Sequence, residues 1–207
     1  MDSVDTQPPF VIAALLAGRL YRMLETAKTM SISSSNAKCI SIRGGTKTVG
    51  FKPLSDYISD MAKDTISISS KISSIALQFS ITAVNEKRAL SALSDFTKVI
   101  NKISDQNKKD SLYFINNKLE TKITSLRQQQ FDYCQLLTIL FDDIAQRIRA
   151  AKIIVINSRT EASRAEEYQN NLFSIADNLE SCSEDIASEI KTCRFYLVNL
   201  KNMIETE

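Results

Sequence analysis

The 207-residue chain contains no tryptophan and no histidine, and it has only 4 glycines and 3 prolines. The lack of histidine excludes Ser-His-Asp and Cys-His nucleophilic sites and any metal site that uses histidine. Most tight turns depend on glycine or proline, so turns must be few and the elements between them long. An all-β sandwich, which needs many turns, is therefore excluded.

Charges of the two signs are almost balanced, with 26 Lys+Arg against 24 Asp+Glu and a net charge of +2. This balance does not indicate a nucleic-acid partner. The four cysteines have no CxxC spacing and stand among apolar neighbours, so we interpret them as buried, reduced thiols: Cys39, Cys134, Cys182 and Cys193. No apolar run reaches the roughly 18 residues of a membrane span, and Phe10 to Ala17 lacks the basic start of a signal peptide. We therefore expect a cytoplasmic protein.

Long stretches of the chain carry a heptad pattern. From Ile58 to Ile103, apolar or small residues recur at steps of three and four, and Glu86 is the one residue unsuited to a core. A strict 3.5-residue period predicts a left-handed coiled-coil bundle. Looser versions run from Leu112 to Ile148 and from Leu172 to Ile204, and a weaker one begins at Leu16.

Three polar or glycine-rich breaks separate these stretches, at residues 44–50, 104–110 and 166–171. The third has no glycine but contains Asn170 and Asn171, which tolerate the left-handed conformation. The two inner segments are matched at about 60 residues, so they can lie antiparallel.

The predicted fold is all-α: a long antiparallel four-helix coiled-coil bundle made of two tandem helical hairpins. Residues 1–106 form the first hairpin, with its tip near 44–51. Residues 107–207 form the second, with its tip near 166–171, and both belong to one bundle.

The chain also contains a sparse internal repeat. A shift of 121 residues aligns Asn36 with Asn157 (157 − 36 = 121) and Arg43 with Arg164 (164 − 43 = 121). Because the aligned residues surround both short breaks, the two tips are interpreted as copies of one unit.

Each copy matches part of the pattern N-A-x-(I/V)-E-A-A-R-A-G-E-x-G-x-G-F-A. The first copy matches at Asn36, Ala37, Arg43, Gly45, Gly50 and Phe51. The second copy matches at Asn157, Glu161, Ala162, Arg164, Ala165 and Glu167. Both segments resemble the cytoplasmic signalling hairpin of methyl-accepting chemotaxis receptors, here as two degenerate tandem copies covering about a third of the chain.

This resemblance implies binding of a chemotaxis histidine kinase and its coupling adapter, or of chemoreceptors. It carries over to these partner-binding residues: Asn36, Arg43, Phe51, Asn157, Glu161, Arg164 and Glu167. The sequence departs from the pattern at Ile40 and Thr46, where the family has glutamates. Receptors of this family are dimers of hairpins, so two hairpins in one chain suggest a monomeric pseudo-dimer.

No catalytic, cofactor-binding or metal-binding residue is predicted, and we expect a non-enzymatic signalling or scaffold protein. The acidic pair Asp142-Asp143 does not converge as an acid/base pair, because sequence neighbours on a helix point about 100° apart. An alternative from another class is a helical-bundle toxin or secretion-system protein acting on membranes. Its support is the apolar stretches Phe10 to Leu16 and Ile153 to Ile156.

Overall fold

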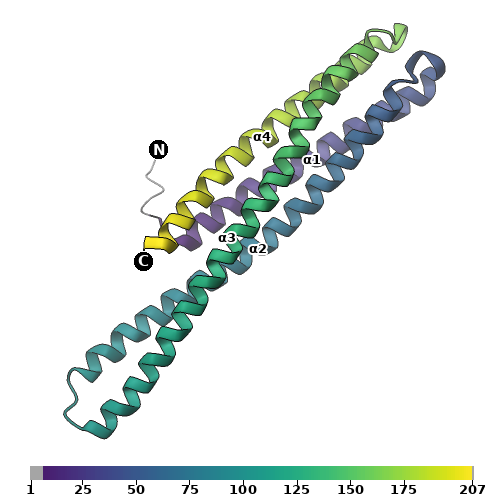
Figure 1. Ribbon diagram of the computed structural model, residues 1–207. Helices are drawn as coiled ribbons and strands as arrows, with labels where there is room; N and C mark the ends of the chain where they lie inside the picture. The colour runs from purple at the N-terminus through teal and green to yellow at the C-terminus, as the bar shows by residue number, and fades with distance from the viewer. Residues whose placement is uncertain (1–6, 207) are drawn as a thin grey trace. The chain divides into compact units, whose positions relative to one another are not determined.

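The computed structural model describes residues 7–206, and the side chains of all of these except residues 106, 205 and 206. Four helices follow one another, with a short 3-10 turn at each of two connections (Figure 1). The elements are α1 (Pro9–Gly44), η2 (Gly45–Thr48), α2 (Phe51–Ile100), α3 (Gln106–Ala162), η3 (Glu166–Tyr168) and α4 (Gln169–Thr206). There is no strand within residues 7–206. The predicted all-α fold of two tandem hairpins in a four-helix bundle is confirmed.

Local sequence explains where the helices begin. Pro9 is the first residue of α1, where its missing N–H is not needed. Asp105 precedes α3 and caps it, since its carboxylate Oδ1 accepts a hydrogen bond from the backbone N–H of Asn107 at 3.1 Å. The connection between α2 and α3 therefore consists of residues 101–105 only. The predicted break at 104–110 was too long at its end, because Asp105 caps the helix and residues 106–110 already belong to α3.

The helices group into two compact units, described here separately. Unit 2 consists of Leu16–Ser73 and Thr138–Phe195, so every helix contributes a stretch to it and the four stretches form a bundle. Within the described residues, unit 1 consists of 7–15, Ser74–Leu137 and 196–206, mostly the hairpin of α2 and α3. Both units draw residues from each of the two predicted hairpins, 1–106 and 107–207.

The heptad stripe of α2 is buried along most of its length. Buried members are Ile58, Met61, Thr65, Ile68, Ile72, Phe79, Thr82, Glu86 and Ala89. Leu93 and Phe96, near the end of α2 in unit 1, are only half-buried. The stripe of α4 is buried from Leu172 to Leu200 with the half-buried Ile175 as its exception. The periodicity thus located the core.

Two sequence-based expectations about polar residues were wrong. Glu86 occupies a core position of unit 1 and is 8% exposed, because the Nε of Arg127 donates to its carboxylate at 2.7 Å and the amide of Gln130 donates to the other oxygen. Cys39 is exposed, since it lies on the outward face of α1 two residues after the buried Ala37. The other three cysteines are buried as expected.

Candidate functional site: the paired tips of unit 2

The two tips of unit 2 each have a residue with a left-handed backbone, at positions related by the repeat. Gly45 has a φ of +54° and Glu166 has a φ of +46°, and they are 121 residues apart (166 − 45 = 121). Each starts the 3-10 turn that joins the two helices of its hairpin. The left-handed residue of the second tip is therefore Glu166, and the two asparagines that tolerate this conformation, Asn170 and Asn171, lie inside α4.

An ion pair at each hairpin obeys the same repeat. The Nζ of Lys38 lies 2.7 Å from the carboxylate of Asp56, and the guanidinium of Arg159 lies 2.7 Å from that of Asp177. The lysine and the arginine are 121 residues apart, and so are the two aspartates (159 − 38 = 177 − 56 = 121). A side-chain hydrogen bond from Lys38 lowers the pKa of Asp56. Backbone and ion pairs together show that the sparse sequence repeat is a structural repeat.

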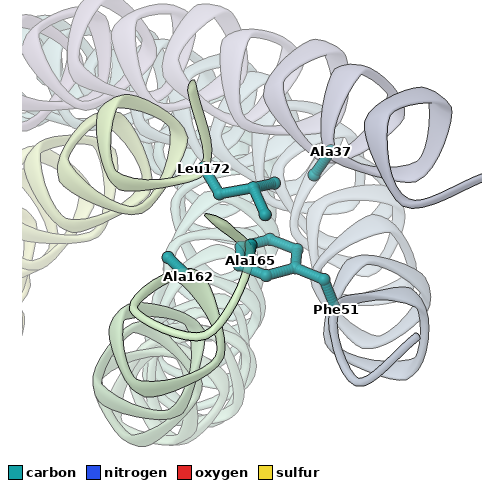
Figure 2. Close-up of a cluster of buried hydrophobic side chains, with 5 residues drawn as sticks. All are labelled: Ala37, Phe51, Ala162, Ala165 and Leu172. Atoms are coloured by element: carbon teal, nitrogen blue, oxygen red, sulfur yellow. The ribbon is translucent and has the colours of Figure 1, made fainter. Parts of the chain in front are cut away.

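The two tips share one hydrophobic cluster (Figure 2). Phe51 from the start of α2 and Leu172 from the start of α4 are equivalent in the repeat (172 − 51 = 121), and both are fully buried. The remaining members are alanines: Ala37, Ala162 and Ala165. Small residues opposite one phenylalanine and one leucine let the helix ends approach closely, so each tip completes the core of the other.

Reciprocal hydrogen bonds close the first tip. The hydroxyl of Ser41 donates to the backbone carbonyl of Thr48, and the hydroxyl of Thr48 donates to that of Ser41, both at 2.9 Å. Both residues are buried, so these bonds satisfy groups that water cannot reach. The turn between α1 and α2 is consequently held by polar groups as well as by Phe51.

Charged side chains connect the surfaces of the two tips. The Nζ of Lys47 in η2 lies 2.6 Å from the carboxylate of Glu166 and 3.7 Å from that of Glu167. A side-chain hydrogen bond with Glu166 raises the pKa of Lys47. Glu161 of α3 also reaches the first tip, since a Cβ added to Gly50 would come within 2.2 Å of its Oε2.

The structure distributes the predicted partner-binding residues over three settings. Glu161, Arg164 and Glu167 belong to the second tip, where Arg164 lies 3.4 Å from Glu161. The asparagine and the arginine of each copy are exposed and seven residues apart: Asn36 and Arg43 lie on α1, Asn157 lies on α3, and Arg164 lies in the turn that follows α3. Phe51 is different: it is 0% exposed, because it fills the shared core, and it is not available to a partner in this structure.

Sequence reasoning missed two residues of this site, Lys47 and Glu166. Lys47 stands between Thr46 and Thr48 in a turn, and nothing in its local sequence indicates a partner in the other hairpin. Glu166 could have been found, because the shift of 121 residues places it on Gly45 and a glycine in a turn often has a positive φ.

Two apolar stretches, Phe10 to Leu16 and Ile153 to Ile156, supported the alternative of a protein that acts on membranes. Each has some apolar side chains in the core and others on the surface. In the first, Ile12 and Leu16 are buried while Phe10 and Leu15 are exposed; in the second, Val155 is buried. Across the described part of the chain, no helix combines the length and the apolar character of a membrane span. Nor do any three Cys, Asp or Glu side chains among residues 7–206 gather as a set of metal ligands.

Comparison with known proteins finds no family model, no curated protein and no solved structure that matches this chain.

Proposed function

We propose that this protein is a non-enzymatic signalling or scaffold protein that acts through protein contacts at the paired tips of unit 2. The observation that supports this most is the repeat itself: two tips, each with a left-handed residue at the equivalent position, pack on one core and leave equivalent asparagine and arginine side chains exposed. A solvated charged side chain on a rigid support contributes to specific binding when a complementary group meets it.

The partners that fit the resemblance are a chemotaxis histidine kinase with its coupling adapter, or chemoreceptors, in the cytoplasm. Arg164 suits this role best, because its side chain is 70% exposed and its ion pair with Glu161, three residues earlier, is long at 3.4 Å. Within unit 2, one chain supplies all four helices of the core. The tips therefore need no second chain to complete them, in keeping with a monomeric pseudo-dimer.

The test is a pulldown of the source cell's kinase and adapter with Arg164→Glu. We expect partner binding to be lost, since one lost charged contact at an interface can cost about 2 to 5 kcal/mol. The melting temperature should stay unchanged, because surface substitutions usually change stability by less than about 0.5 kcal/mol. Arg88→Glu on α2 is the matched control: it makes the same change at another exposed arginine.

Two results would contradict the proposal. Equal losses in Arg164→Glu and Arg88→Glu would show that total charge, not the tip, governs binding. Full partner binding by a double variant that carries both Arg164→Glu and Arg43→Glu would show that neither tip is the contact surface.

A further inference from the structure

A groove of about 290 Å³ lies between α3 and α4 of unit 2, away from the tips. Its lining repeats one pattern on both helices. An isoleucine follows an alanine after three residues, and basic residues follow the same alanine after four and after seven residues. The residues are Ala145, Ile148, Arg149 and Lys152 on α3, and Ala187, Ile190, Lys191 and Arg194 on α4. Four basic side chains therefore border a floor of alanine and isoleucine over about 10 Å of helix.

Most of these basic side chains have no ion-pair partner among the described residues. Arg149, Lys152 and Lys191 are exposed, and none of them has an ion-pair partner in the described part of the chain. Arg194 pairs with Asp142, yet its Nε is buried without a hydrogen-bond acceptor. In a protein whose net charge is only +2, the three unpaired basic groups around this groove form a local positive field that attracts an anion, and the Nε of Arg194 adds a further donor.

The repeat provides a comparison within the same molecule. Subtracting 121 from each lining residue gives the equivalent face of the first hairpin: Leu24, Ala27, Lys28, Ser31, Ile66, Ser69, Ser70 and Ser73. That face has one basic residue, and the carboxylate of Glu25 already pairs with it at 2.8 Å. The four cations are consequently a property of α3 and α4, and not of the repeated fold.

The shape of the groove favours a helix as its occupant. Ile148 and Ile190 are 2% and 3% exposed, so the base of the groove is closed and an occupant meets mainly the alanines and the basic side chains above them. Ala145 and Ala187 are small, which lets a third helix approach along the groove. A partner helix laid there would bring its flanking side chains to the four cations.

We propose that the groove between α3 and α4 binds an acidic amphipathic helix of a partner protein. Small apolar side chains of that helix lie over Ala145 and Ala187 and along the aliphatic parts of the basic side chains. Glutamate or aspartate side chains on its flanks pair with Arg149, Lys152, Lys191 and Arg194. This surface is separate from the tips, so it provides a second contact in addition to the proposed function.

The test measures fluorescence anisotropy of a labelled peptide, about three heptads of leucine, alanine and glutamate, titrated with the full-length protein. Its counterpart with glutamine in place of glutamate tests the charge. We expect the acidic peptide to bind more weakly as salt is raised, and the glutamine peptide to bind at least tenfold more weakly. K152E/K191E should lower the affinity about ten- to thirty-fold, and K152Q/K191Q less.

The matched control is K71E/K87E, which makes an equal change in net charge at two exposed lysines of α2. It should bind the acidic peptide like the unaltered protein, and circular dichroism should show that all variants keep their helices. Equal weakening by both glutamate variants would overturn the proposal. So would equal binding of the two peptides, or binding to phosphatidylglycerol vesicles through Lys152 and Lys191 without binding of the peptide, which would assign the groove to a lipid surface.

Discussion

At the scale of single residues, Glu166 is unusual because a left-handed backbone is unfavourable for every residue with a Cβ. The conformation costs a non-glycine residue about 1 to 2 kcal/mol. The equivalent Gly45 has space around it, with nothing within 4 Å of an added Cβ, so any cost of a side chain there comes from the backbone alone. The left-handed residue is thus strained in the second tip, where it is Glu166, and unstrained in the first tip, where it is Gly45.

Glu166→Gly should therefore stabilise the protein by about 1 kcal/mol, less the small contribution of the exposed ion pair with Lys47. Gly45→Ala should destabilise it by a similar amount. Chemical denaturation followed by circular dichroism measures both. Glu166→Gln is the control, because it keeps the strained backbone and removes only the charge. A loss of stability in Glu166→Gly would show that the ion pair outweighs the strain.

Two buried thiols make stability depend on pH in the alkaline range. Burial raises the pKa of Cys134 to about 12, and burial likewise raises the pKa of Cys193 to about 12. Below about pH 8 each thiol is protonated in both the folded and the unfolded state, so it contributes almost no pH dependence. Between about pH 9 and 12 only the unfolded thiol releases its proton, which favours unfolding.

We expect the free energy of unfolding to fall between pH 9 and 12 by up to about 1.4 kcal/mol per pH unit for each thiol. Urea unfolding across this range gives the slope, and Cys134→Ala with Cys193→Ala should reduce it. In the native protein at pH 8, iodoacetamide should modify the exposed Cys39 well before the three buried cysteines. An unchanged slope in the double variant would assign the alkaline loss to other groups.

At the scale of elements, α2 and α3 of unit 1 pair around a polar layer that contains the one charged residue of the heptad stripe, Glu86. Glu86 receives hydrogen bonds from Arg127 and Gln130, and its side chain is 10% exposed against 29% for Arg127. A buried charge without its partner is costly, whereas replacing the whole pair by apolar residues is often neutral. The arginine can reach water more easily than the glutamate can.

Arg127→Leu should consequently destabilise the protein by about 1 to 3 kcal/mol, because it removes the charge opposite the buried carboxylate. Glu86→Leu should cost less, and the double variant should recover most of the loss of Arg127→Leu. A double-mutant cycle by urea unfolding measures the coupling. Additive single effects would mean that the two side chains contribute independently.

Comparison of the helices with the sequence patterns shows which parts of the fold were predictable. The heptad stripe from Ile58 to Ala89 predicted the core, because burial of one helix face requires that period. Helix ends were less certain: a lone aspartate, Asp105, decides where α3 begins, and one capping hydrogen bond leaves little trace in composition. In the candidate site, the motif placed Arg164 and Phe51 in the right tip. It could not show that Phe51 points inward, because burial depends on the second hairpin.

At the scale of the whole molecule, each hairpin depends on the other for its core. Phe51 of the first hairpin packs in one cluster with Ala162 and Leu172 of the second, and both units combine residues of the two hairpins. Ion pairs cross between the hairpins as well, as between Arg19 of α1 and Glu189 of α4 at 3.2 Å. Most of the helices' stability should come from this packing, because helix propensity alone is marginal in water.

Separately expressed hairpins, residues 1–106 and 107–207, should therefore lose most of the cooperative unfolding of the full chain. Each would expose the apolar stripe that its counterpart covers, so we expect low helicity or aggregation by circular dichroism and light scattering. Mixing the two should restore helicity in a one-to-one complex, because the interface buries the stripes again. The matched comparison is the same mixture with Phe51→Asp in the first hairpin, which places a charge in the shared core and should prevent assembly. A cooperative thermal transition in either hairpin alone would contradict this expectation, since that hairpin would then have a core of its own.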